Sequence, residues 1–413
     1  MSQAVLSPPT TTTPALPRRL PLLMASACGV AVANVYFPQA LTPLIAHSFG
    51  TTPGTAASVA TVAQLGYAAG IFALVPLGDR LPRRRLLVVL LALTAAALLA
   101  AGMAPSIGAL AAASAVVGAV TVIPQLLIPM AAGLVDAQRR GAVIGTLQGG
   151  LIGGILLART FGAGLGGALG WRAPYLVAAV VTGLLAVVLA RALPHAAAPS
   201  TERYPVLLAQ TLKLLASEPD LRRSAAYQAT VFAGFSAAWT ALALLVTGPT
   251  YRLGPNAVGV LALIGAVSML TTPATGRLVD RHGADRVNVV CILAALASAG
   301  VLACGAWGGG IGLAALVAGL VLLDIAVQGN QVANQARIMA LRPAARSRIN
   351  TGYMTCSFLG GSAGSAIGVQ AFSHAGWAGV CAVIAGSCLL ALATHGIATR
   401  AGRPAPTPAA QPR

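Results

Sequence analysis

Two charged residues lie deep inside stretches that are otherwise apolar enough for a membrane interior. Asp324 falls in the run LVLLDIAVQGNQVANQAR, residues 320–337, and it alone among the chain's eight acidic residues lies away from the expected loops. Arg159, in GGILLARTFGAGLGG, is the only basic residue placed as deeply. Burying a charged side chain at bilayer depth costs a few kcal/mol. Both residues are therefore candidates for a functional site.

Polar side chains follow Asp324 at helical spacing. Gln328, Gln331 and Gln335 stand four, seven and eleven positions after it, which places them on the same face of a helix. Asn330 and Asn334 form a neighbouring stripe. A polar stripe on an apolar helix faces protein or a water-filled cavity rather than lipid.

Two mechanisms could use Asp324, and they can coexist. It could carry protons, because burial away from water favours the neutral form of a carboxyl group. It could instead stay ionised in a structural ion pair with Arg159, which would offset the burial cost of both groups. We expect a proton-coupling role for Asp324 with Arg159 in the same site, and contact between them stays open at this point.

The elements that must position these residues are membrane-spanning helices. Hydrophobic residues make up 57% of the 413-residue chain and charged residues only 8%, against about 25% charged in soluble domains. Division at charged and Gly/Pro-rich breaks predicts an all-α integral membrane protein with twelve spans, each long enough for a hydrocarbon core of ~30 Å. The spans are expected at residues 21–46, 55–78, 85–103, 106–133, 140–167, 171–193, 222–248, 256–276, 287–306, 309–336, 349–372 and 376–397.

The net charge of +18 indicates topology rather than nucleic-acid binding. All 26 basic residues except Arg159, Arg172 and Arg252 lie near the N-terminus, in alternate loops or near the C-terminus. Basic residues stay on the cytoplasmic side during insertion. Both termini are therefore predicted to be cytoplasmic in a multi-pass protein of the inner cell membrane, with no nucleic-acid partner.

The N-terminus and the cysteines add little chemistry. Residues 1–20 are predicted to be a disordered cytoplasmic segment. Arg18, the apolar run after it and Ala31-Val32-Ala33 imitate a cleavable signal peptide, but the eleven further spans favour an uncleaved first helix. The six cysteines all fall in predicted spans and are expected to be small apolar packers. No metal-ligand spacing occurs, and no cofactor is expected.

The two halves of the chain repeat each other. PLGDRLPRRR after the second span corresponds to GRLVDRHGADR after the eighth, and a Gly-Trp pair opens both the sixth and the twelfth spans. The expected units are a six-helix bundle over residues 21–193, a cytoplasmic linker over 194–221, a second six-helix bundle over 222–398 and a cytoplasmic tail over 399–413.

Glycine recurs at every fourth position in the fifth and eleventh spans. Gly141, Gly145, Gly149 and Gly153 form one stripe, and Gly360, Gly364 and Gly368 form the other. Small residues on one helix face let backbones approach closely. We expect each stripe to pack against another helix, and matched stripes would also suit halves that rock against each other.

Together these features resemble the major facilitator superfamily of secondary transporters. Its loop pattern G-x-L-x-D-R-x-G-x-R is matched in the second copy by Gly276, Leu278, Asp280, Arg281, Gly283 and Arg286. The first copy keeps Leu77, Asp79, Arg80, Arg83 and Arg84, with Val75 and Pro82 where the family has glycine. The resemblance covers residues 20–398 and implies two pseudo-symmetric six-helix bundles around a cavity that opens alternately to each side.

The resemblance also implies roles for individual residues. In this family the first, fourth, seventh and tenth spans surround the cavity, so its expected lining is Asn34, Tyr36, Gln39, Gln125, Gln228, Phe235, Trp239, Gln328 and Gln331. The loop residues are expected to gate access, through charge-assisted hydrogen bonds made in the outward-open state and broken in the inward-open one. They are Asp79, Arg80, Arg83, Gly276, Asp280, Arg281, Gly283 and Arg286.

The chain departs from the proton-coupled drug exporters of this family in two spans. Those exporters carry an arginine in the fourth span and G-P-x-x-G-G in the fifth, and this chain has neither. It is more similar to the bacterial efflux-permease-like branch.

A transporter is the expected function, exporting a small organic molecule by proton antiport. An uptake symporter or an uncoupled facilitator of the same fold is the alternative. A membrane enzyme would need a nucleophile–base pair, and a sensor would need an output domain. No G-x-x-x-x-G-K-[ST] sequence occurs, so no ATPase partner is implied, and a monomer is expected.

Overall fold

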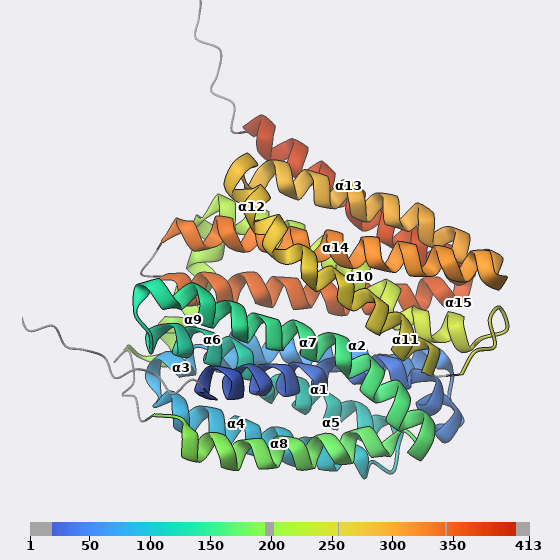
Figure 1. Ribbon diagram of the computed structural model, residues 1–413, viewed down its shortest axis with the longest axis horizontal. Helices are drawn as coiled ribbons and strands as arrows, with labels where there is room; N and C mark the ends of the chain where they lie inside the picture. Colours follow the sequence, from blue (N-terminus) through green and yellow to red (C-terminus); the bar gives the residue numbers. More distant parts are fainter. Residues whose placement is uncertain (1–18, 195–201, 255, 343–344, 402–413) are drawn as a thin grey trace, which may run out of the picture.

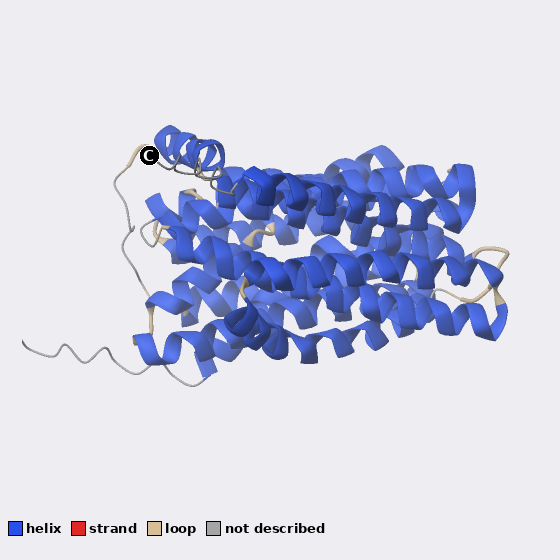
Figure 2. Ribbon diagram, turned by 90° about the horizontal axis from the view of Figure 1, so that it is seen from above, coloured by secondary structure: helices blue, strands red, loops and turns tan. Residues whose placement is uncertain are grey.

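All regular structure in the described part of the chain is helical. The computed structural model describes residues 19–194, 202–254, 256–342 and 345–401, and Figure 2 shows helices joined by short loops. The terminal segments predicted to be disordered or tail-like lie almost entirely outside the described residues, at 1–18 and 402–413.

The N-terminal half contains the first six predicted spans. The second span ends in a separate short helix, and the fourth is broken at Thr121 and Val122, where the Thr121 hydroxyl donates to the carbonyl of Ala31 at 2.9 Å. Pro124 in the first turn of the following helix suits this restart. The helices are α1 Arg19–Phe49, α2 Pro53–Leu74, α3 Leu77–Arg80, α4 Arg83–Gly102, α5 Ile107–Val120, α6 Ile123–Gly133, α7 Ala137–Leu169 and α8 Arg172–Ala192.

The C-terminal half has a more strongly broken eighth span, in which a 3₁₀ segment separates two short helices. Its elements are α10 Pro219–Thr247, α11 Asn256–Gly265, η1 Ala266–Thr271, α12 Thr272–His282, α13 Ala284–Ala303, η2 Cys304–Trp307, α14 Gly309–Leu341 and α15 Arg346–Ala401.

The element α15 is two helices that fold back on each other. Its backbone leaves the helical region at Ala375 and at Gly376, whose φ is 60°. Both arms contact the same level of α10: Gly364 packs against Ala233, while Ile384 lies beside Gly234. The chain therefore reverses at residues 375–376, and α15 supplies the eleventh and twelfth spans.

Ten helices in the described residues are long and apolar enough to cross a membrane. The folded-back α15 is one of the ten, although it supplies two spans. The eighth span is not among the ten, because it is broken into α11, η1 and α12. The structure is consistent with the predicted twelve spans in two bundles. In Figure 1 the N-terminal half, blue to green, lies below the C-terminal half, yellow to red.

The spans run roughly parallel, so each helix has a defined end. The segments 80–85, 137–140, 281–286 and 345–348, which carry clustered arginines, all lie at the left end in Figure 1. We call this end the basic face.

Part of the predicted linker is a helix. Residues 195–201 lie outside the described part, and α9, Tyr204–Ser217, follows them on the basic face. The Tyr204 hydroxyl donates to the carbonyl of Ala73 in α2 at 2.7 Å. Arg348 of α15 donates to Gln210. This helix therefore contacts both halves.

The glycine prediction is confirmed in one half and wrong in the other. Gly360, Gly364 and Gly368 pack against the backbone of α10. Gly141, Gly145, Gly149 and Gly153 instead have no neighbour near the position of a Cβ atom. The close contact of α7 with α1 uses Gly150 and Gly154, because α1 passes over the other side of that helix.

Candidate transport site

Four buried side chains from four spans meet in the middle of the bundle. They are Gln39 of α1, Arg159 of α7, Trp239 of α10 and Asp324 of α14, and none is more than 3% exposed. We call them the central cluster. Two come from each half of the chain, so the cluster joins the two bundles.

Arg159 is surrounded by aromatic rings. Its Nε donates to Oε1 of Gln39 at 3.2 Å, and its guanidinium carbon lies 3.9 Å from the centroid of the Trp239 ring. The rings of Tyr36 and Phe235 lie at 5.4 and 5.6 Å. Its Nη1 and Nη2 have no hydrogen-bond partner among the described residues. Cation–π contacts stabilise this buried cation while leaving two donor groups unused.

Asp324 has one hydrogen-bonded oxygen and one that is free. Its Oδ1 accepts from Nε1 of Trp239 at 3.1 Å, and its Oδ2 has no partner in the described structure. The carboxylate packs against Gly265, the last residue of α11 before the eighth span becomes a 3₁₀ helix. A Cβ atom at position 265 would overlap Oδ2. The carboxylate of Asp324 therefore lies directly beside the break in the eighth span.

Trp239 connects the two charged groups, which do not form an ion pair with each other. The ion pairs of the described residues include no contact between Arg159 and Asp324 within 4.0 Å. The indole instead covers the guanidinium with its ring and donates its N–H to the carboxylate. The fixed pair considered for the ionised state is therefore absent from this conformation.

A cavity of about 160 Å³ lies next to the central cluster. On each of the four helices its lining residues stand between one and three turns nearer the basic face than the cluster residue. On α7, for example, Gln148, Ile152 and Ile155 line the cavity and Arg159 lies beyond them. The central cluster therefore lies just beyond the deep end of this cavity.

The structure places most of the predicted lining residues in the cavity. They are Tyr36, Gln125, Gln228, Phe235, Gln328 and Gln331. Gln39 and Trp239 belong to the central cluster instead. Asn34 points to another side of α1, where its Nδ2 donates to the hydroxyl of Thr182 in α8 at 3.4 Å.

Several lining residues escaped the sequence prediction because it considered only four of the twelve spans. The second, fifth, eighth and eleventh spans also contribute: Tyr67, Gln148, Thr272, Met354, Ser357 and Phe358. Gln148 had a visible signal, since it is an isolated amide in an apolar, glycine-rich span. The others are residue types common in any buried helix.

The comparison with known families decides what kind of protein carries this site. A family model described as Major Facilitator Superfamily matches residues 22–310. The chain belongs to the major facilitator superfamily.

Relatives and a solved structure agree with this assignment. The protein named Uncharacterized transporter YgaY of Escherichia coli O157:H7 is 38% identical over 360 residues, covering 87% of this chain and 90% of that protein. A chloramphenicol resistance protein of Streptomyces lividans is 30% identical over 278 residues, covering 66% and 70%. The nucleoside transporter NupG matches with a TM-score of 0.73 over 92% of this chain and 99% of that one, at 15% identity, which shows the fold alone. The chain is thus a multi-pass membrane transporter.

No ion pair of the described residues joins the superfamily's two loop motifs across the halves. Asp79 pairs with Arg83 in its own loop at 3.3 Å. Asp280, Arg281 and Arg286 are exposed, and no ion pair of the described residues includes them. The other motif positions lie in the same two turns: Arg80 ends α3, Gly276 is in α12, and Gly283 joins α12 to α13 with a φ of 79° that favours glycine.

Contacts between the transporter's halves are strongest away from the basic face. The Thr160 hydroxyl of α7 donates to the carbonyl of Gly259 in α11 at 2.8 Å. Thr61 of α2 and Ser365 of α15 share a hydrogen bond of 2.9 Å. Nearer the basic face, Asn350 donates to Gln125 at 3.2 Å. The first two contacts join the halves on the side away from the basic face.

The second amide stripe of α14 has a structural role. Asn330 donates to Asn288 of α13 at 2.8 Å, Asn288 donates to Asn334 at 3.0 Å, and Asn334 donates to Asn330 at 3.1 Å. All three residues are fully buried. This closed ring of amides joins α13 to α14 and does not line the cavity.

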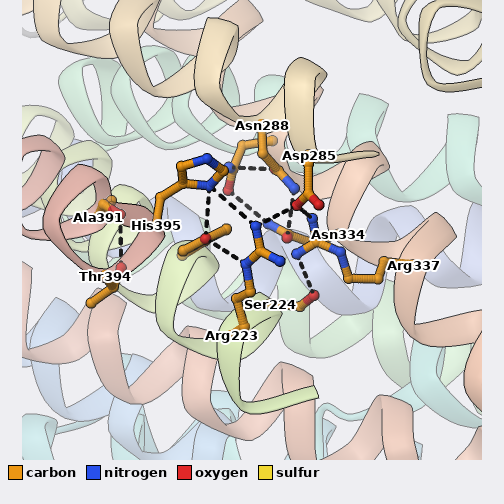
Figure 3. A network of polar contacts seen from close by, with 11 residues as sticks. Arg223, Ser224, Asp285, Asn288, Asn334, Arg337, Ala391, Thr394 and His395 are labelled. Carbon is orange, nitrogen blue, oxygen red and sulfur yellow. Dashed lines mark hydrogen bonds and ion pairs between the residues drawn. The ribbon is translucent and has the colours of Figure 1, made fainter. Parts of the chain in front are cut away.

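A charged network covers the basic face of the C-terminal half (Figure 3). Asp285 of α13 accepts from Arg223 of α10 at 2.6 Å and from Arg337 of α14. Arg223 also donates to the hydroxyl of Tyr227 at 2.7 Å. The same hydroxyl lies 2.9 Å from Nδ1 of His395 in α15. The network ties four spans of one half together.

Proposed function

We propose that this transporter exports a small organic molecule in exchange for protons, with Asp324 as the proton carrier and Arg159 as the charge that responds to it. On this proposal the basic face is cytoplasmic, both termini lie on that side of the inner membrane, and the protein acts as a monomer. The substrate occupies the cavity beside the central cluster.

The observation that carries the proposal is the free Oδ2 of Asp324. An ion buried without a charged partner costs several kcal/mol, and among the described residues only Trp239 donates a hydrogen bond to this carboxylate. A proton on Oδ2 removes that charge. A carboxyl group at the end of a cavity, without a fixed ion-pair partner, is suited to load and release a proton as access alternates.

Trp239 offers a link between protonation and helix movement. When Asp324 is ionised, the unpaired Nη groups of Arg159 are the cationic donors available in the central cluster. The indole of Trp239 contacts both groups. A change of charge on Asp324 therefore acts on α10, the helix that also carries Gln228 and Phe235 into the cavity.

The arrangement of contacts supports an inward-facing state. The halves pack together away from the basic face, and the cavity lies between the central cluster and the basic face. The lock proposed for the two loops, at Asp79 and Asp280, would form when the basic side closes. Its absence here is what that proposal expects of an inward-facing conformation.

Export is favoured over import by one relative. The Streptomyces lividans protein is named for chloramphenicol resistance, which suits a protein that lowers the internal concentration of a drug. Similarity to the efflux-permease-like branch points the same way.

The proposal can be tested in everted vesicles that have an acid interior and contain a pH-sensitive dye. A panel of neutral antibiotics that includes chloramphenicol is added outside. Antiport predicts that a transported compound accumulates and that the internal pH rises, because protons leave as the compound enters. A fall in internal pH would indicate symport. Uptake that ignores the pH gradient would identify an uncoupled facilitator and contradict the proposal.

A further inference from the structure

The hydrogen-bonding groups of the cavity are neutral. Six of its lining residues are glutamines, and none of the described lining residues is charged. The glutamines come from both halves of the chain: Gln125, Gln148, Gln228, Gln328, Gln331 and Gln335. A charged ligand bound among them would lose its water shell without gaining a counter-ion, at a cost of several kcal/mol.

Most of these amides are free to bind a ligand. The side chains of Gln148, Gln328, Gln331 and Gln335 make no hydrogen bond to the described protein, although they line the cavity. The side-chain oxygen of Gln125 already accepts from Asn350 at 3.2 Å, and that of Gln228 accepts from Tyr353 at 3.1 Å. The cavity therefore offers both donors and acceptors.

Part of the cavity wall is built from aromatic rings. Phe232 and Phe235 of α10 stack with centroids 5.5 Å apart and an interplanar angle of 16°. Phe358 of α15 meets the ring of Phe232 edge-on at 5.3 Å, and Tyr67 of α2 meets Phe358 at 4.5 Å. This wall presents flat apolar surface on which a planar ring can pack.

The charge of Arg159 is shielded from this space. The rings of Tyr36 and Phe235 lie against its guanidinium, and the same two residues line the cavity. A ligand in the cavity therefore contacts the rings of Tyr36 and Phe235, and the guanidinium lies behind those rings. Asp324 is not among the lining residues either.

The size of the cavity limits the ligand. Its volume is about 160 Å³, and an engineered cavity of about 150 Å³ holds one benzene molecule. The space suits a single substituted ring in this conformation.

We infer that the cavity selects uncharged aromatic molecules that carry both a hydrogen-bond donor and an acceptor. The ring packs on the wall formed by Phe232, Phe235 and Phe358, and the polar substituent binds the free amides of α14. This inference rests on the proposed function, since it names the substrate class of the same cavity. Charged aromatic molecules of the same shape are excluded by desolvation.

Three probes of nearly equal shape test the inference. They are 4-nitrobenzamide, which is neutral, 4-nitrobenzylammonium, a cation, and 4-nitrobenzoate, an anion. Binding to the purified full-length protein at pH 7 is measured by ligand-observed NMR. The neutral amide should bind at least about tenfold more tightly than either ion. Equal or tighter binding of an ion, or no saturable binding of the amide, would overturn the inference.

Variants at Gln331 place the probe in the cavity. Gln331→Leu should weaken the amide about fivefold, the loss of one neutral hydrogen bond. Gln331→Glu should raise the relative affinity of the cation by a similar factor or more. Gln370→Leu, at an exposed position of α15, is the matched control and should leave all three affinities unchanged. If Gln331→Leu and Gln331→Glu both behave like the control, 4-nitrobenzamide binds elsewhere and the inference is overturned.

This test separates the substrate class from the transport mechanism. Equilibrium binding needs no gradient and no orientation in a membrane. If the neutral amide binds as expected while vesicles show no coupling to pH, the inference stands and the proposed antiport fails. If antiport is observed for charged compounds alone, the antiport stands and the inference fails.

Discussion

Gly153 and Gly154 are neighbours in α7, and replacing each by alanine should have opposite effects. A Cβ at Gly154 would stand 2.6 Å from the carbonyl carbon of Gly29 in α1. Ordinary contact begins at 3.4 Å, so the two helices would have to separate by roughly an ångström. A Cβ at Gly153 meets nothing within 4 Å.

The difference between the two variants isolates the cost of the overlap. Both positions are inside the same helix, so the gain in helix propensity, up to about 1 kcal/mol, is common to both. What remains is the overpacking cost, about 1–3 kcal/mol. Gly153→Ala should be neutral or slightly stabilising, and Gly154→Ala should be destabilising.

Thermal unfolding of the purified protein in detergent provides the assay. The Tm of Gly154→Ala should lie several degrees below that of Gly153→Ala. Because α1 and α7 also carry Gln39 and Arg159, Gly154→Ala should reduce transport per folded molecule as well. Equal Tm values, or a lower Tm for Gly153→Ala, would refute the packing described for α1 and α7.

Three further predictions concern the polar contacts. Trp239→Phe keeps a ring over Arg159 but removes the N–H that donates to the buried carboxylate of Asp324. The free energy of unfolding should therefore fall by about 1 kcal/mol, and pH-driven accumulation should drop. Unchanged values of both would contradict the proposed link between Asp324 and α10 through Trp239. Asn288→Leu removes the partners of Nδ2 of Asn330 and Oδ1 of Asn334, both buried, and should lower stability by about 1–3 kcal/mol in chemical denaturation. A loss of binding with normal stability would contradict its structural role. Asp285→Asn removes the carboxylate from the partly exposed network of Figure 3 and should cost about 1 kcal/mol or less; the Tm difference from wild type should shrink at high salt, and a difference independent of salt would argue against an ionic origin.

The spans and the two charged residues were predictable from sequence because they rest on composition. A membrane helix needs about twenty apolar residues, so Asp324 and Arg159 stand out without knowledge of any contact. The turn at Gly376 was predictable for the same reason, since it separates two apolar runs.

The contacts made by those residues were not predictable. Trp239 comes between Arg159 and Asp324 because of the relative rotation and depth of three helices from two halves, and no local pattern encodes that arrangement. The packing prediction for the glycine stripe of α7 was wrong for a related reason. Glycines occur on more than one side of that helix, and the position of α1 decides which side is packed.

The break in the eighth span is another feature that the sequence prediction missed. The 3₁₀ segment at Ala266–Thr271 contains no proline and no glycine. It lies next to Gly265, which packs directly against the carboxylate of Asp324. Pro273, in the first turn of α12, adds a local cause, because it has no N–H to donate and its ring disfavours a continuous helix through the residues just before it.

The most direct test of the central claim compares two activities of Asp324→Asn in proteoliposomes, with the substrate identified by the vesicle panel. Exchange of labelled for unlabelled substrate needs alternating access but no proton transfer, whereas accumulation against a concentration gradient needs both. The account predicts that Asp324→Asn retains exchange and loses pH-driven accumulation, and that Asp285→Asn, the control, retains both. Accumulation by Asp324→Asn at the wild-type level would contradict the role of this carboxylate as the proton carrier.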